Sequence, residues 1–259
     1  MKKLNNVLVP TPHGLMVVNR NEAAFAFGTG VALLEEGGYD PLEIGLMREI
    51  VGILPPGCVI LDVGANIGVH TLEFARACEA KSGVVHAFEP QRILHQMLAG
   101  NVAINNYQNV YCHLAAAGAK PGKVKMPRID YSIPSSFSGI ELGEGRQREF
   151  IGQAPEWNGA EETVPVVSLD SLDLPRVDFM KIDVEGMECE VLAGAQKLIE
   201  KFHPPIYIEH AKSDPKALAQ ALWNHGYQIF VFSHLDWVAV PEANSPVQIN
   251  GLERLARWD

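Results

Sequence analysis

Two glycines placed directly after an apolar run form the part of this sequence that is best suited to binding a ligand. The residues from Val59 to Val63 are typical of a strand buried on both faces, and Gly64 and Gly68 follow them. An apolar-periodic segment from Val69 to Ala77 then predicts a helix. Because glycine has no Cβ and a helix N-terminus presents free N–H groups, this arrangement lets a ligand approach the backbone closely.

Two carboxylates accompany this turn. Asp62 precedes the first glycine, and Glu89 ends the next apolar run, twenty-one residues after Gly68. A carboxylate at the end of a second parallel strand can accept hydrogen bonds from both hydroxyls of a ribose. The two acids also fit a simpler interpretation as loop carboxylates stabilised by nearby helix dipoles. Their joint presence at this spacing favours a nucleoside site.

The spacing of the glycines indicates which class of nucleotide cofactor the loop fits. Gly64 and Gly68 form G-x-x-x-G, whereas a dinucleotide loop requires G-x-G-x-x-G. With Asp62 the motif becomes D-x-G-x-x-x-G, which resembles the loop of S-adenosylmethionine-dependent methyltransferases. This resemblance implies that Asp62 faces the ammonium group of the cofactor, directly or through water. It also implies the residues that hold S-adenosyl-L-methionine: Asp62, Gly64, Asn66, Gly68, Glu89, Pro90 and Asp183.

Composition narrows the class of protein. The chain has 259 residues, of which 47% are hydrophobic, so it can form a substantial core, and we predict one domain over 1–259. A formal charge of −10 argues against a nucleic-acid partner. The sequence has no apolar run of transmembrane length and no signal-peptide core near Met1, so we expect a cytoplasmic protein without a membrane partner. The cysteines are widely spaced and are expected to be reduced, buried and structural: Cys58, Cys78, Cys112 and Cys189.

The pattern of residues 1–54 predicts an N-terminal β/α extension that precedes the core. Short β-like pieces at Asn6–Val9 and Leu15–Val18 predict a hairpin, and the segment from Phe25 to Tyr39 fits no clear element. Asp40 followed by Pro41 predicts a helix start, with the helix continuing to about Leu54.

Residues 55–241 predict the cofactor-binding core. Apolar runs alternate with helical patterns, one of which spans Val191 to Ile199, so we expect right-handed crossovers in a doubly wound sheet. The sheet should end in an antiparallel hairpin of Gln228–Phe232 and Trp237–Val240. The expected parallel strands are Val59–Val63, Val84–Glu89, Val110–Ala116, Val177–Asp183 and Pro205–His210.

A long insertion interrupts this alternation. Lys123–Met126 and Thr163–Val167 can pair as edge strands around a polar, glycine-rich excursion, residues 129–162. Excursions of this length are either functional lids or mobile loops, and the sequence favours neither.

The complete pattern resembles the Rossmann-like α/β methyltransferase fold and, more narrowly, the FkbM-type methyltransferase family. The resemblance covers roughly Tyr39 to His210 and implies methyl transfer to an oxygen, often a hydroxyl of a sugar, polyketide or other secondary metabolite. We therefore predict an S-adenosylmethionine-dependent O-methyltransferase acting on a small molecule or saccharide. Four blocks carry the resemblance, of which the last is the most specific: Val59–Gly68, Phe88-Glu89-Pro90, Val164–Leu172 and Lys181-Ile182-Asp183-Val184-Glu185-Gly186-Met187-Glu188.

The strand ends supply three candidate catalytic residues, Asp183, Glu185 and His210. Asp183 can contact the methionine part of the cofactor, orient the acceptor, bind a metal or accept a proton. His210 has the intrinsic pKa of a base near neutral pH, although a histidine at a strand end can also be structural. Glu185 is assigned to the site because it lies within the family block, and Glu188 is assigned a structural role.

Other polar residues near these strand ends have less specific predictions. Lys181 shares a strand face with Asp183, so we expect a structural ion pair between them. His70 can either line the pocket or cap its helix. Asp183, Glu209 and His210 are ligand types that a divalent ion accepts, but strand-end carboxylates also occur without an ion, and no metal is included among the predicted cofactors.

Two other functions remain open at this point. A nucleotide-dependent oxidoreductase would use a related sheet, although the glycine spacing argues against it. A binding protein that keeps the cofactor fold without catalysis is the second alternative. RNA methylation is disfavoured by the acidity of the chain.

Overall fold

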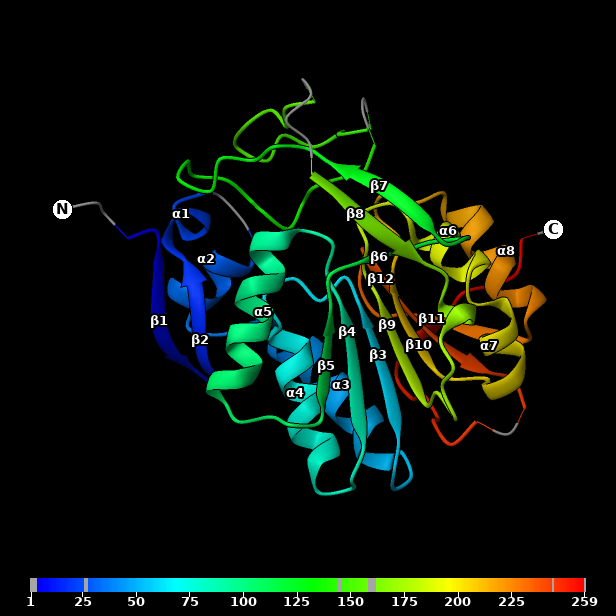
Figure 1. The fold of residues 1–259 in the computed structure, drawn as a ribbon. Helices are drawn as coiled ribbons and strands as arrows, with labels where there is room; N and C mark the ends of the chain where they lie inside the picture. Colours follow the sequence, from blue (N-terminus) through cyan, green and yellow to red (C-terminus); the bar gives the residue numbers. More distant parts are fainter. Residues whose placement is uncertain (1–3, 26–27, 144–145, 158–161, 244, 259) are drawn as a thin grey trace.

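The computed structural model describes residues 4–25, 28–143, 146–157, 162–243 and 245–258, and a mixed sheet forms its centre (Figure 1). Its five central strands are parallel, and one reversed strand lies beside the last of them, as the sequence predicts. Across the sheet the order is β13 (Glu253–Arg254), β11 (Tyr227–Val231), β12 (Asp236–Pro241), β10 (Ile206–Glu209), β9 (Phe179–Ile182), β3 (Val59–Val63), β4 (Val84–Phe88) and β5 (Val110–His113).

Helices cover both faces of this sheet. Every residue of β3 is buried, and successive side chains enter opposite layers because the side-chain period of a strand is two. Leu61 packs in the layer of α6 (Glu188–Ala193), α7 (Gln196–Phe202) and α8 (Pro215–Asn224), whereas Ile60 packs in that of α3 (Pro41–Ile53) and α4 (Val69–Glu79). Burial of one such side chain stabilises the fold by about 1.5–3 kcal/mol. None of the described helices has both the length and the apolar character needed to cross a membrane.

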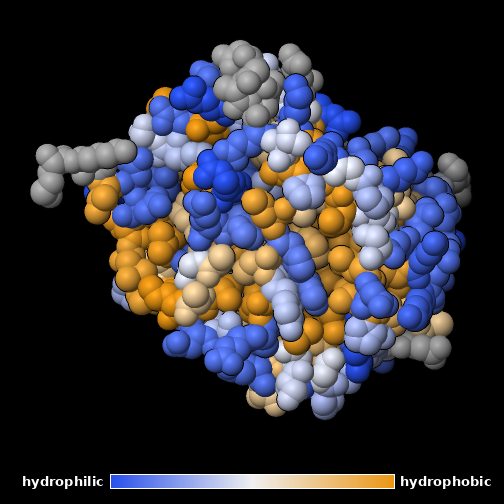
Figure 2. All heavy atoms as spheres, in the orientation of Figure 1, coloured by the Kyte–Doolittle hydropathy of each residue, from blue (hydrophilic) through white to orange (hydrophobic). Residues whose placement is uncertain are grey.

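The N-terminal extension begins with the predicted hairpin, formed by β1 (Asn6–Thr11) and β2 (Gly14–Asn19). The free edge of β2 is covered by α5 (Arg92–Ile104), where Asn101 and Asn105 accept hydrogen bonds from the backbone N–H groups of Val17 and Leu15 at 2.6 and 2.9 Å. These amides satisfy an edge that would otherwise be open to pairing. Figure 2 shows apolar residues over this hairpin, where Leu8 is exposed.

Two short helices and one long helix complete the extension. The segment that the sequence left unassigned contains α2 (Thr29–Leu34), which follows α1 (Arg20–Ala23); residues 26–27 lie outside the described residues. Helices this short depend on tertiary packing, so their sequence pattern is weak. The predicted start of α3 is confirmed, because Asp40 Oδ1 accepts hydrogen bonds from the N–H groups of Leu42 and Glu43.

A second sheet carries the long insertion. Its order is β6 (Ala116–Ala117), β8 (Glu162–Val167) and β7 (Gly122–Met126). The predicted pairing of the last two is confirmed and is antiparallel, but they belong to this separate sheet and not to an edge of the main one. Within the described part of the excursion, Ile140, Leu142 and Ile151 pack in one cluster with Met126 and Val164. The excursion, green in Figure 1, therefore lies on this sheet, beyond the carboxyl ends of β3 and β4.

Two predicted elements are divided in the structure. The strand predicted over Val110–Ala116 ends at His113, and Ala116 leaves the main sheet to pair with β8. The helix predicted from Val191 to Ile199 is two helices, α6 and α7. The break lies at Gly194, where a Cβ would stand 2.1 Å from the carbonyl oxygen of Gly118. The apolar period continues across the break because both helices bury the same face against the sheet.

The four cysteines are free thiols, as expected. Cys58 and Cys78 are buried, with their sulfur atoms 3.4 Å apart. Cys112 and Cys189 are only half buried, which corrects the expectation that all four lie in the core. Each lies near an end of its element, where packing is less complete than at the centre of the sheet.

Candidate active site

An open cleft of about 610 Å³, a volume that includes the solvent at its mouth, lies at the carboxyl ends of β3, β4 and β9. Strand β3 has β4, the next strand along the chain, on one side and the later strand β9 on the other. The order of the strands therefore reverses at β3, and the cleft lies at this switch point. The excursion forms a further wall through Ser138, Ile140 and Leu142. Of the residues predicted from the sequence, those that line the cleft are Gly64, Asn66, Glu89, Pro90, Asp183 and Glu185.

The glycine loop packs too tightly for any other residue. Gly64 has φ +84°, and a Cβ there would stand 1.7 Å from the carbonyl oxygen of Asp183. Gly68 has φ +96°, and a Cβ there would approach Leu98 Cδ1 to 2.7 Å. These two glycines let the end of β3 approach β9 while α4 begins against α5.

The glycine loop also fixes the orientation of Glu89. Its two carboxylate oxygens accept hydrogen bonds from the backbone N–H groups of Gln91 at 2.8 Å and Asn66 at 2.9 Å. Burial raises the pKa of Glu89 to about 7, although these two hydrogen bonds lower it. Asn66 donates its amide to Thr29 Oγ1, and its Oδ1 is buried without a hydrogen-bond partner in the described structure. The cleft thus presents a fixed carboxylate and an unpaired amide oxygen.

Asp62 occupies a different position from the one predicted. It is fully buried, its Oδ2 accepts a hydrogen bond from Thr71 Oγ1 at 2.5 Å, and it is not among the residues that line the cleft. Its Oδ1 lies 3.9 Å from Lys181 Nζ. Asp62, in β3, is therefore held by Thr71 of α4 and Lys181 of the neighbouring strand β9, and its contact with a cofactor ammonium stays a prediction.

Lys181 forms the structural ion pair that the strand alternation predicts. Its Nζ lies 3.0 Å from Asp183 Oδ2 and donates to the carbonyl oxygen of Gly64 at 3.2 Å. Burial lowers the pKa of Lys181, but the charges of Asp183 and Asp62 outweigh it and raise this pKa above the ordinary lysine value. The ammonium thus stays charged, and Asp183, whose side chain is 33% exposed, is held at the cleft.

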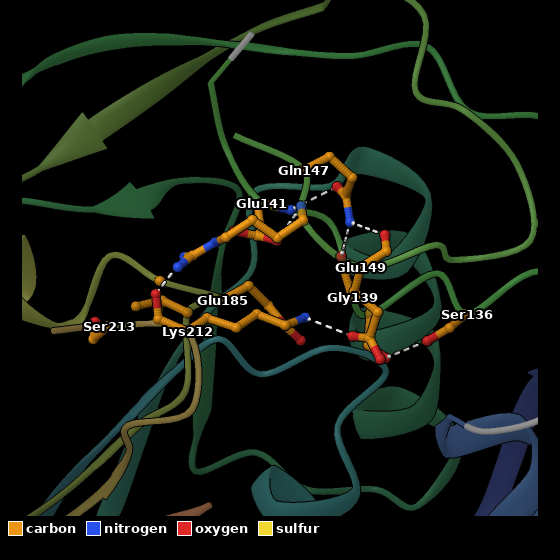
Figure 3. Close-up of polar contacts among 12 residues, drawn as sticks. Ser136, Gly139, Glu141, Gln147, Glu149, Glu185, Lys212 and Ser213 are labelled. Carbon is orange, nitrogen blue, oxygen red and sulfur yellow. Dashed lines mark hydrogen bonds and ion pairs between the residues drawn. The ribbon is translucent and has the colours of Figure 1, made fainter. Parts of the chain in front are cut away.

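The loop after β9 carries Glu185 into the cleft. Glu185 has φ +56°, and its carboxylate forms an ion pair with Lys212 (Figure 3). Burial and the charge of Asp183 raise the pKa of Glu185 to about 7, against the lowering effect of Lys212. Glu188 has a structural position, because its Oε1 accepts hydrogen bonds from the N–H groups of Val184 and Gly186 in the same loop.

A second pocket adjoins this cleft and shares Ser138 and Glu185 with it. It encloses about 1000 Å³ of empty space, and Glu209 and Lys212 contribute to its lining. Burial, followed by the charge of Asp183, raises the pKa of Glu209 to about 10. From the sequence, Glu209 was considered only as one of three possible metal ligands. The burial of its side chain is not evident from a position at the end of a strand.

His210 and His70 lie outside these two pockets. The ring of His210 stacks on Trp237 with centroids 4.2 Å apart, and burial lowers its pKa. His70 is buried, with Nε2 2.9 Å from Glu43 Oε1. Among the described residues, no group of three His, Cys, Asp or Glu side chains is placed to hold a metal ion. This holds for Asp183, Glu209 and His210, the possible ligands considered from the sequence.

Comparison with known proteins identifies the family. The profile described as methyltransferase FkbM domain matches residues 62–229, well over half of the chain. The chain belongs to the FkbM methyltransferase family. The matched range contains the glycine loop, Glu89 and the whole block from Lys181 to Glu188, so the family and the Rossmann-like fold predicted from these residues are confirmed.

Individual relatives of this FkbM domain are moderately similar. It is 30% identical over 168 residues to the hexuronic acid methyltransferase AglP of Haloferax volcanii, covering 63% of this chain and 61% of AglP. It is 27% identical over 260 residues to the AMB antimetabolite synthetase AmbE of Pseudomonas aeruginosa, covering 86% of this chain but 11% of AmbE. Among solved structures, the FkbM methyltransferase of Methylobacillus flagellatus matches with a TM-score of 0.49 at 18% identity, over 72% of this chain and 44% of that one. The chain thus spans less than two thirds of each of these relatives.

Proposed function

We propose that this FkbM domain is an S-adenosylmethionine-dependent methyltransferase that transfers a methyl group to a hydroxyl oxygen of a small molecule or saccharide. The observation that carries the proposal is the fixed carboxylate of Glu89 at the switch-point cleft. Its oxygens are oriented by Asn66 and Gln91, and each keeps lone pairs free for the two hydroxyls of a ribose.

The residues of the cleft fit S-adenosylmethionine. Glu89 would accept hydrogen bonds from the ribose, the unpaired Oδ1 of Asn66 and the carboxylate of Asp183 are acceptors suited to the ammonium group, and Gly64 leaves the backbone accessible. The bound cofactor supplies an electrophilic methyl group on a sulfonium. The protein therefore contributes alignment and removal of the acceptor proton.

Glu185 is the residue that we assign to proton removal. It lines both the cleft and the second pocket, so an acceptor hydroxyl between them lies within its reach. A pKa of about 7 suits a general base near neutral pH. The Glu185 carboxylate would accept the proton of the acceptor hydroxyl as the acceptor oxygen takes the methyl group and the methyl–sulfur bond breaks, with S-adenosylhomocysteine as the leaving group. Lys181 would hold Asp183 in place. His210 lies outside both linings, which favours Glu185 for this role.

The decisive experiment is isothermal titration of the purified protein with S-adenosylhomocysteine, with NADH as the control ligand. We expect micromolar binding of the first and none of the second. Glu89→Gln should weaken the binding about 30-fold or more, because it removes hydrogen bonds to a charged acceptor. The glutamine amide has the size of the carboxyl and keeps one oxygen to accept from Asn66 or Gln91, and circular dichroism checks that the variant folds. Glu162→Gln, at an exposed acid paired with Arg92, is the matched control and should bind normally.

The same titration has a pH dependence. The ribose hydroxyls donate to the charged form of Glu89, so affinity should fall as the pH decreases below about 7, by about tenfold per pH unit at most. NADH binding in place of S-adenosylhomocysteine would favour the oxidoreductase alternative. Cofactor binding without turnover on any acceptor would favour the non-catalytic alternative.

A further inference from the structure

The second pocket has the position and chemistry of an acceptor site. We propose that it binds the methyl acceptor and that it selects an uncharged, polyhydroxylated molecule over one that carries a carboxylate. This inference rests on the proposed function and names the substrate class of the same site.

The position of the second pocket follows from the residues that it shares with the cleft. Ser138 and Glu185 line both, so a molecule in the second pocket can place a hydroxyl beside the proposed base. The opposite walls are formed by Gly28 from the N-terminal extension and by Leu235 from the loop before β12. These segments lie outside or at the margin of the residues that resemble other family members most closely, as expected for a pocket that sets specificity.

The cations of the second pocket are already paired. Its lining, within the described residues, includes Arg148 and Lys212. Arg148 Nε lies 2.8 Å from Glu141 Oε2, and its guanidinium also donates to the carbonyl oxygen of Lys212. Lys212 Nζ forms ion pairs with Glu185 and, at 3.2 Å, with Glu149 (Figure 3). A carboxylate on the acceptor would have to break one of these ion pairs to find a positive partner, and would leave a glutamate unpaired.

Glu209 supplies the complementary neutral group. Its Oε2 is buried and has no hydrogen-bond partner in the described part of the chain, although the residue lines the pocket. Burial and the surrounding acids Asp183, Glu185, Glu188 and Asp236 raise its pKa to about 10, so it is a carboxylic acid at neutral pH. A neutral carboxylic acid both donates and accepts a hydrogen bond, as a sugar hydroxyl does. Ser136 and Ser138 add two more hydroxyl groups to the lining.

The acceptor preference proposed for this chain differs from the substrate named for one of its relatives. AglP of Haloferax volcanii is named for a hexuronic acid, which carries a carboxylate. The paired cations and neutral Glu209 instead predict that this FkbM domain prefers the corresponding hexose.

The test uses matched acceptors with the full chain and S-adenosylmethionine. The acceptors are the methyl glycosides of glucose, galactose and mannose, each paired with its uronic acid, and S-adenosylhomocysteine formation is measured. We expect kcat/KM to be about tenfold or more higher for at least one hexoside than for its uronate. Equal or faster turnover of the uronates would overturn the charge selection. Binding of S-adenosylhomocysteine without turnover of any hexoside would overturn the acceptor class, whereas absence of that binding would instead contradict the proposed function.

Variants of Glu209 test the role of the neutral acid. Glu209→Leu should raise KM for the hexoside about tenfold or more while the affinity for S-adenosylhomocysteine is retained. Glu209→Gln, which keeps a donor and an acceptor, should restore most of the lost affinity, and Glu200→Gln on the exposed face of α7 is the control. The carboxyl carbon resonance of Glu209, assigned by its loss in Glu209→Gln, should show the protonated form at pH 7. A charged carboxyl at that pH, or an unchanged KM in Glu209→Leu, would overturn the role.

Discussion

The two pockets at the carboxyl edge of the sheet are held together by different forces. The glycine-loop wall of the cleft is fixed by backbone geometry: Gly64 has a positive φ, and backbone N–H groups orient Glu89. The second pocket is enclosed by ion pairs between long side chains, such as that of Lys212 with Glu185 and Glu149. The glycine-loop wall of the cleft cannot change without a change in the backbone. The second pocket, in contrast, can be altered one side chain at a time.

This difference agrees with the roles proposed for the two pockets, cofactor binding in the cleft and acceptor binding in the second pocket. A cofactor is the same molecule in every member of a family, so a rigid site formed by backbone atoms suits it. An acceptor differs between members, and side chains on loops can change without disturbing the sheet. The contrast predicts that substitutions of the loop glycines affect folding and cofactor binding together, while substitutions of side chains around the second pocket affect mainly turnover.

The largest expected effect is that of Gly64→Ala. A Cβ at this position would stand 1.7 Å from the carbonyl oxygen of Asp183, and the backbone has φ +84°. The ends of β3 and β9 would have to separate, so we expect a loss of more than about 4 kcal/mol in the free energy of unfolding, measured by urea denaturation. S-adenosylhomocysteine binding should be lost as well.

The matched control for this substitution is Gly100→Ala in α5, where the added methyl group meets no atom within 4 Å. Because alanine favours a helix, this variant should be stabilised by up to about 1 kcal/mol. If Gly64→Ala unfolded at the same urea concentration as the native protein, the backbone account of the cleft would be wrong.

An intermediate effect is expected for Lys212→Met. The charge of Lys212 lowers the pKa of Glu185, which burial otherwise raises, so the substitution should raise that pKa above about 7. A general base acts in its deprotonated form, and the rise of kcat/KM with pH should therefore move to higher pH. Affinity for S-adenosylhomocysteine should stay within about threefold of the native value.

The control for this profile is Lys216→Met, at an exposed position in the first turn of α8, which should leave the pH profile unchanged. A Lys212→Met profile that coincides with the native one would remove Glu185 from the role of base. A large loss of cofactor affinity would instead show that the two pockets are not separable.

A smaller effect on stability than that of Gly64→Ala is expected for Arg148→Ala. The arginine side chain is 63% exposed, but the carboxylate of its partner Glu141 is 2% exposed and keeps, among the described residues, only the backbone N–H of Arg148 as a donor. The free energy of unfolding should therefore fall by about 1–3 kcal/mol. The acceptor KM should nevertheless rise, because Arg148 connects the excursion to the loop after β10 through the carbonyl oxygen of Lys212. Arg92→Ala, which breaks a pair with Glu162 that is exposed on both sides, should lower the free energy of unfolding by at most about 1 kcal/mol and leave KM unchanged. Equal KM values in the two variants would contradict the proposed acceptor pocket.

The sequence predicted the glycine-loop wall of the cleft because its determinants are local. The glycine loop and Glu89 lie within adjacent strands and turns, and Asn66 and Glu89 are only 23 residues apart. Positive φ values and strand ends leave recognisable residue types at fixed spacing. The same reasoning gave the five parallel strands and the terminal antiparallel hairpin, but not the order of the strands across the sheet.

The tertiary structure decided the rest. Arg148 and Lys212 are 64 residues apart, and nothing in either local sequence shows that they meet. Burial is also invisible locally: it raises the pKa of Glu209 and holds Asp62 outside the lining of the cleft. The stacking of His210 on Trp237 likewise depends on how the folded strands meet. The sequence alone therefore determined the fold and the glycine loop, because these follow from backbone geometry. The charge, depth and neighbours of the acceptor pocket depend on long-range packing, which only the folded chain defines.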